Sequence, residues 1–152
     1  MKRKLIALIL IVTLSLASSA CGEDTAKRIE RLRIYTDAAL QLVTDFERDK
    51  VLTAEQSQTV RARLLVVRSS LDVFIERALD LGKVDSKSKP ELARLFAAVA
   101  GGVREVMNVA KPLIESAIRA LGLPDSSRLL ARINTLLVGI ETAARLVESQ
   151  LK

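Results

Sequence analysis

Residues 54–81 read AEQSQTVRARLLVVRSSLDVFIERALDL, and this stretch determines the fold class. Its apolar residues recur in alternating steps of four and three: Val60, Leu64, Val67, Leu71, Phe74, Ala78 and Leu81. In an α-helix this spacing forms one apolar stripe that faces a partner helix. Residues 53–56, Thr-Ala-Glu-Gln, form a capping-box pattern, and Gly82 is a natural C-terminal stop. The sequence therefore predicts an amphipathic helix over 54–81.

Three further segments show the same periodicity. Residues 25–49 place Ile29, Leu32, Ala39, Val43 and Phe46 on one face, with Thr36 as its weak position. After a second capping-box pattern at residues 88–91, the stripe continues through Leu92, Phe96, Val99, Val103, Val106, Ala110, Leu113 and Ala117. Because this stripe keeps its phase through Gly101-Gly102 and Pro112, we predict one kinked helix to about residue 121 rather than two helices. Residues 126–151 carry Leu130, Ile133, Leu137, Ile140, Ala144, Val147 and Leu151.

Composition and loop length together indicate how these helices pack. Hydrophobic residues make up 49% of the chain and aromatic residues only 3%, with no Trp. The core must therefore be built from Leu, Val, Ile and Ala, as in packed helices. Short loops between long helices make neighbours antiparallel. The predicted fold is all-α: an antiparallel up-down four-helix bundle over residues 26–152.

The N-terminal segment has the three-part layout of a secretory signal. Lys2-Arg3-Lys4 form a positive region, residues 5–16 an apolar region, and Ser18-Ser19-Ala20 a run of small residues before Cys21. The alternative is an uncleaved membrane helix, which needs about 20 apolar residues. Thr13 and several serines interrupt the apolar run well before that length. This favours a cleaved signal.

Residues 16–22, Leu-Ala-Ser-Ser-Ala-Cys-Gly, resemble the lipobox of bacterial lipoproteins. The resemblance covers residues 1–22 only, and Ser18 stands where Leu is usual. It implies that residues 1–20 are a signal peptide cut before Cys21, that Cys21 is lipidated, and that residues 21–25 are a short tether. Gly22, in place of an Asp that would imply inner-membrane retention, implies an outer-membrane anchor facing the periplasm. Cys21 is the only cysteine, so no intramolecular disulfide can form; the alternative for it is a buried or stray thiol.

Several chemistries are disfavoured by what the sequence lacks. The net charge of +6 falls to +3 when Lys2, Arg3 and Lys4 leave with the signal, and the remaining charges are mixed, which disfavours nucleic-acid binding. The chain has no His, so the usual general base and the commonest metal ligand are missing. Gly101-Gly102 matches no nucleotide-binding fingerprint. We therefore predict no catalytic residues, no metal and no cofactor.

Two surface features are candidate binding sites. Lys27, Arg28, Arg31 and Arg33 begin the first helix, within reach of the predicted anchor, and are candidates for contact with anionic head groups. The alternative is a merely solvated face. Ala97, Ala98 and Gly101 form a bare spot on the charged outer face of the third helix, where another helix can approach closely. The alternative there is a tolerated kink beside Gly102.

These features predict a membrane-anchored lipoprotein of the bacterial cell envelope. It would act as a non-enzymatic binding or structural protein, through a protein partner or a second copy of itself. The alternative is a periplasmic carrier that holds a lipid or other apolar ligand within the helical bundle.

Overall fold

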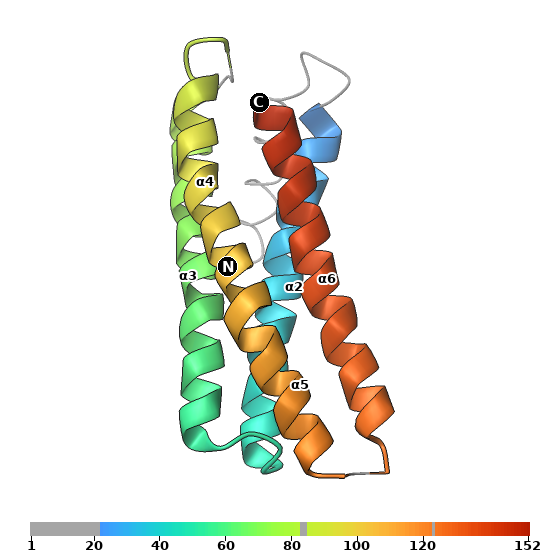
Figure 1. Cartoon of the computed structure of the whole chain (residues 1–152). Helices are drawn as coiled ribbons and strands as arrows, with labels where there is room; N and C mark the ends of the chain where they lie inside the picture. Colours follow the sequence, from blue (N-terminus) through green and yellow to red (C-terminus); the bar gives the residue numbers. More distant parts are fainter. Residues whose placement is uncertain (1–21, 83–84, 123) are drawn as a thin grey trace, which may run out of the picture.

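The computed structural model describes residues 22–82, 85–122 and 124–152, and this part of the chain forms an antiparallel four-helix bundle (Figure 1). The predicted signal peptide, residues 1–20, and the predicted lipidation site Cys21 lie outside the described residues. The first two long helices are α2 (Gly22–Arg48) and α3 (Ala54–Leu81). The third is composed of α4 (Lys89–Glu105), a π-helical turn η1 (Val106–Ala110) and α5 (Lys111–Ala120), and the fourth is α6 (Ser126–Leu151). The bounds of α3 and α6 are those predicted from the sequence.

The helices are arranged in a ring in chain order. α2 contacts α3 and α6, and α4 contacts the same two helices from the opposite corner. In Figure 1 the start of α2, the α3–α4 connection and the end of α6 lie at one end of the bundle. The α2–α3 and α5–α6 turns lie at the other end. The up-down topology follows from these short connections.

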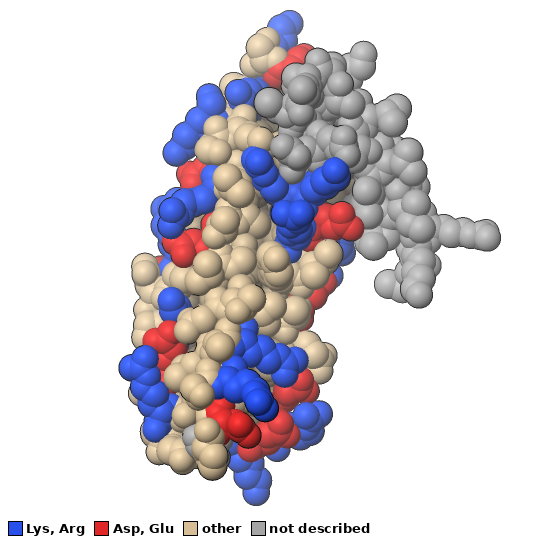
Figure 2. Space-filling view, turned by 90° about the vertical axis from the view of Figure 1, so that its right-hand side faces the viewer, with Lys and Arg blue, Asp and Glu red and all other residues tan. Residues whose placement is uncertain are grey.

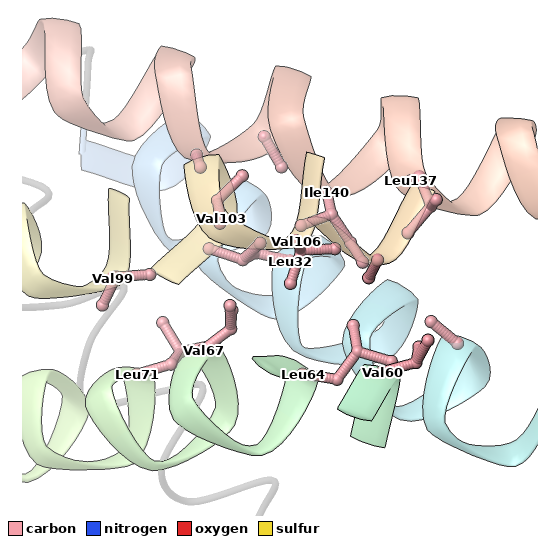
Figure 3. Close-up of a cluster of buried hydrophobic side chains, with 14 of the residues drawn as sticks. Leu32, Val60, Leu64, Val67, Leu71, Val99, Val103, Val106, Leu137 and Ile140 are labelled. Carbon is pink, nitrogen blue, oxygen red and sulfur yellow. The ribbon is translucent and has the colours of Figure 1, made fainter. Parts of the chain in front are cut away.

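The predicted stripes form the core. Figure 3 shows side chains from every corner of the ring pointing toward the bundle axis, among them Leu32, Leu64, Val103 and Ile140. Each of these four side chains is at most 3% exposed. Thr36, the weak position of the first stripe, is also fully buried, and its hydroxyl donates to the carbonyl oxygen of Leu32 at 2.7 Å. This bond within the helix satisfies the buried hydroxyl without a partner across the core.

The third long helix is continuous, but its apolar stripe changes register. The buried residues after Ala110 are Ile114 and Ile118, whereas the sequence predicted Leu113 and Ala117, which are only partly buried. Pro112 has no N–H, and its ring would clash with the carbonyl of Asn108 in an α-helix. The chain widens to a π turn just before it, where the N–H of Lys111 donates to the carbonyl of Val106. A π turn takes one extra residue, which moves each later core position one residue along.

The two predicted helix starts differ from each other in outcome. Thr53 forms the predicted capping box with Gln56. The Thr53 hydroxyl accepts from the backbone N–H of Gln56 at 3.2 Å, and the backbone N–H of Thr53 donates to the side-chain oxygen of Gln56 at 2.9 Å. Ser88 does not cap α4 with its side chain. Its hydroxyl accepts from the N–H of Asp85 at 2.9 Å, while the Asp85 carboxylate accepts from the N–H groups of Lys87 and Ser88. A local turn centred on Asp85 therefore replaces the predicted second capping box.

α2 begins at Gly22, so residues 22–25, expected as a tether, are helical. Tertiary packing accounts for this extension. Thr25 and Ala26 are buried, and the Thr25 hydroxyl donates to the side-chain oxygen of Gln150 near the end of α6. The first turn of α2 is thus part of the bundle.

Candidate functional site

The end of the bundle that carries the start of α2 is where a lipid on Cys21 would attach. Cys21 immediately precedes Gly22, the first residue of α2. The hydrogen bond between Thr25 and Gln150 joins this turn to α6. Because Gly22 is already helical, a lipid on Cys21 would be attached one residue from this end of the bundle.

The structure does not bring the four candidate basic residues into one cluster. Lys27 and Arg31 are exposed and lie one turn apart on the outer side of α2. Arg28 is half-buried on the side of α2 nearer α6, two turns before Tyr35, whose ring lies 2.9 Å from the position of a Cβ at Gly139. Arg33 is turned toward α3, where its guanidinium lies 3.7 Å from the carboxylate of Asp72.

Arg33 belongs to a network of ion pairs between α2 and α3. Arg68 of α3 pairs with Asp37 of α2 and, at 3.3 Å, with Asp72 on its own helix. Arg61 pairs with Glu47 of α2 at 2.8 Å. Exposed pairs of this kind stabilise a fold by at most about 1 kcal/mol each. They do fix the direction of Arg33, which points away from the outer face on which Lys27 and Arg31 lie.

The candidate partner residues are accessible, as the sequence predicted. Ala97 and Ala98 are exposed, and nothing lies within 4 Å of a Cβ built at Gly101. The neighbouring Gly102 is different. It is buried, and a Cβ there would lie 3.1 Å from Cγ2 of Val67, so Gly102 permits the close approach of α4 to α3. The Gly101-Gly102 pair therefore combines an open surface position with a packing position.

Sequence reasoning missed the large apolar side chains beside this bare spot. Val66 and Val73, seven residues apart on the outer side of α3, are 49% and 53% exposed, and Cγ1 of Val66 lies 3.4 Å from the position of a Cβ at Gly102. With Ala97, Ala98 and Gly101 they form a surface that we call the α3·α4 face. The signal was present in the sequence, because these residues lie outside the heptad stripe of residues 54–81 and make α3 apolar on two sides. A helix that is apolar on both sides is normally covered on both.

Two ion pairs bound the α3·α4 face along the seam between its helices. Arg77 holds Glu91 at 2.8 Å toward the end that carries Gly22, and Arg63 lies 3.9 Å from Glu105 toward the other end. The hydrogen bond from Arg77 holds the pKa of Glu91 below its ordinary value. The two arginines are fourteen residues apart, or about 21 Å along α3 at 1.5 Å per residue. Between them, in line with the two arginines at steps of four and three, α3 presents Val66, Ser70 and Val73, which are uncharged.

A groove of about 490 Å³ lies at the end of the bundle away from Gly22. It is formed by the α2–α3 turn, including Val51 and Leu52, and by the end of the third long helix around Leu121. Glu47, Lys50 and Gln56 supply polar groups at its wall. This volume falls within the range of small-ligand sites.

Within the described residues, no helix has the length and apolar character needed to cross a membrane, and no group of acidic or cysteine side chains is placed to hold a metal ion. The chain matches no known protein family, no curated protein and no solved structure.

Proposed function

We propose that this chain is a lipoprotein of the bacterial cell envelope, anchored through Cys21, most simply in the outer membrane facing the periplasm. Its helical bundle binds another protein and performs no catalysis. The observation that carries the proposal is the combination of a lipobox-like segment ending at Cys21 with a bundle that begins at the next residue. A domain joined so closely to its anchor works at the membrane surface.

The α3·α4 face supports the binding part of the proposal. It combines exposed Val side chains on α3 with a bare, backbone-accessible surface on α4. Small residues allow the backbone of another helix to approach, and the larger side chains beside them supply apolar area for it to cover. We therefore assign a helical segment of a partner protein to this face.

The anchor is tested by fatty-acid labelling in cells. The wild-type chain should incorporate labelled palmitate, and Cys21→Ser should lose the label and leave the lipoprotein processing route. A wild-type chain that takes up no label would refute the proposed localisation.

The partner face is tested by cross-linking in cells. Ala98→Glu places a charge on the α3·α4 face, and Ala131→Glu places the same charge at an exposed alanine of α6. Any cross-linked complex of the wild type should disappear in Ala98→Glu and persist in Ala131→Glu. Persistence in both variants would remove the α3·α4 face from the proposal.

A second candidate function, a carrier of an apolar ligand, is favoured by the groove at the far end of the bundle. Val51, Leu52 and Leu121 would contact such a ligand there. The purified mature protein should then release a bound lipid that mass spectrometry detects. Leu121→Glu, at an exposed position, should abolish that release without unfolding the bundle.

A further inference from the structure

Each helix of the α3·α4 face carries one line of residues beside the seam between them. Both lines advance in alternating steps of three and four, which keep a set of residues on one side of a helix. The α3 line is Arg63, Val66, Ser70, Val73 and Arg77, and the α4 line is Glu91, Arg94, Ala98, Gly101 and Glu105. Because ion pairs join the two lines at both ends, the lines lie side by side on one face of the bundle.

The ion pairs also determine which residues of the two lines lie level. They join the first residue of the α3 line to the last residue of the α4 line, and the last to the first. The middle residues, Ser70 and Ala98, therefore lie level with each other. Cγ1 of Val66 lies 3.4 Å from the position of a Cβ at Gly102, as this register requires. The two lines thus run side by side in opposite directions, residue against residue.

The two lines carry opposite charges at their ends. The α3 line has an arginine at each end and no acidic residue, whereas the α4 line has a glutamate at each end and one arginine, Arg94. The side of the bundle where α6 lies is different, because basic and acidic side chains occur together there along both margins of an uncharged strip (Figure 2). The α3·α4 face instead presents a positively charged line beside a negatively charged one.

Between their ends the two lines are complementary in shape. Val66 and Val73 are 49% and 53% exposed, so the α3 line is a ridge of branched side chains. On the α4 line, Ala98 is exposed and has only a methyl group, and nothing lies within 4 Å of a Cβ built at Gly101. The α3 line of one molecule therefore fits the α4 line of another, with its ridge on the bare surface and its arginines beside the glutamates.

We propose that a second copy of this chain covers the α3·α4 face and that a two-fold axis parallel to the bundle axis relates the two copies. This axis places the α3 line of each copy along the α4 line of the other, antiparallel and at the same level. The arginine at each end of the α3 line then contacts a glutamate of both copies. Val66 lies against Gly101 of the second copy, and the methylene stem of Arg94 covers Val73. The inference rests on the proposed function, because it names the partner of the face assigned there.

The other way to stack the face on itself uses a two-fold axis perpendicular to the helices. It places α3 on α3 and α4 on α4, centred on Ser70 and Ala98. Arg63 would then meet Arg77 of the second copy, and like charges across an interface are unfavourable. This axis also places the two starts of α2 at opposite ends of the dimer. The parallel axis places both starts at one end, where lipids on the two Cys21 residues reach the same bilayer.

Disulfide formation between copies tests the arrangement. Ser70→Cys and Ala98→Cys are made in separate full-length chains with different epitope tags, expressed together, and oxidised in isolated membranes before detergent is added. A disulfide requires two Cα atoms within about 7 Å. The mixed pair should form a disulfide that carries both tags, and neither variant should form one when expressed alone. Leu65→Cys with Ala98→Cys should form none, because Leu65 is as exposed as Val66 but lies outside the α3 line.

Each other outcome has a separate meaning. A disulfide of Ser70→Cys with itself would overturn the parallel axis, and no disulfide in the mixed pair would overturn the second copy. If the mixed pair fails while Ala98→Glu still removes a cross-linked complex with another protein, the dimer falls and the proposed partner face stands. The wild type reports on the anchor, because its only thiol is Cys21 and an acylated Cys21 forms no disulfide. A disulfide in the wild type would refute the anchor, and the excess in the mixed pair would still report on the face.

Two adjacent substitutions test the contribution of the ridge. Val66 and Leu65 are each 49% exposed, but only Val66 belongs to the α3 line. Val66→Glu places a charge within one turn of Glu105 of the second copy, and the two-fold axis repeats this repulsion. Val66→Glu should therefore lower the ratio of dimer to monomer, measured from the yield of the mixed disulfide, by about tenfold or more. Leu65→Glu should leave the ratio unchanged, and equal effects of the two substitutions would refute the proposed interface.

Discussion

Gly101 and Gly102 are adjacent in one helix, yet replacing each with alanine should change the stability of the bundle in opposite directions. An alanine in a helix interior is about 1 kcal/mol more favourable than a glycine. At position 101 the new Cβ has no neighbour within 4 Å, so nothing opposes this gain. Gly101→Ala should therefore raise the free energy of unfolding by about 1 kcal/mol.

At position 102 the same gain is opposed by overpacking. The new Cβ would lie 3.1 Å from Cγ2 of Val67 and 3.4 Å from Cγ1 of Val66. Val66 is half exposed and can rotate away, but Val67 is fully buried, and a β-branched side chain in a helix has essentially one allowed rotamer. Extra methyl groups in a packed core cost about 1–3 kcal/mol. With a central cost of about 2 kcal/mol, Gly102→Ala should lower the free energy of unfolding by about 1 kcal/mol.

Thermal unfolding followed by circular dichroism measures the difference. For a domain of this size, 1 kcal/mol corresponds to a change in Tm of about 3–5 °C. Gly101→Ala should therefore melt above the wild type and Gly102→Ala below it. If Gly102→Ala is as stable as Gly101→Ala, the close approach of α4 to Val67 is not a packing constraint, and the reasoning is refuted.

Two further predictions concern the core and the α3–α4 connection. Leu71 is fully buried, so Leu71→Asp leaves a charge without a partner at a cost of several kcal/mol, and circular dichroism should show an unfolded bundle. Arg63→Ala removes only an exposed ion pair at 3.9 Å and should change the free energy of unfolding by less than about 1 kcal/mol. Similar small effects from both substitutions would contradict the predicted stripe. The pKa of Asp85 is lowered mainly by the hydrogen bond from the N–H of Ser88, so the turn before α4 should be stable above the ordinary carboxyl range and should loosen only as the pH falls through the lowered pKa. The amide NMR signals of Lys87 and Ser88 should titrate at that lowered pKa in the wild type and should not titrate in Asp85→Asn. A titration midpoint at or above the ordinary carboxyl pKa would contradict the role given to these hydrogen bonds.

Helix bounds and most of the core could be predicted because they depend on local spacing. In α3 and α6 the apolar residues recur in alternating steps of four and three, and these steps determine which face of each helix is buried. A capping threonine before α3 and a glycine-proline turn before α6 mark where each helix starts. The register of α5 could not be predicted. Heptad spacing continues through Leu113 and Ala117 in the sequence, but the ring of Pro112 favours a π turn, and that turn makes Ile114 and Ile118 the buried residues.

Some positions of the candidate surface residues could also be predicted from the sequence, and others could not. Ala97, Ala98 and Gly101 lie opposite the apolar stripe of their helix, so the sequence alone predicts that they are accessible. The direction of Arg33 does not follow, because its partner Asp72 lies on another helix and the pairing depends on how α2 and α3 pack.

The ring order of the helices explains where the α3·α4 face lies relative to the proposed anchor. α2 follows the proposed anchor, and in an up-down bundle the last helix returns to pack beside the first. α3 and α4 then occupy the two remaining corners, and their shared face is directed away from α2 and α6. The Arg33–Asp72 and Arg68–Asp37 pairs lie on the seam between α2 and α3, so charged groups border the α3·α4 face on the side toward α2. The two middle helices therefore present the α3·α4 face on the side opposite α2 and α6, where the proposed partner helix would bind.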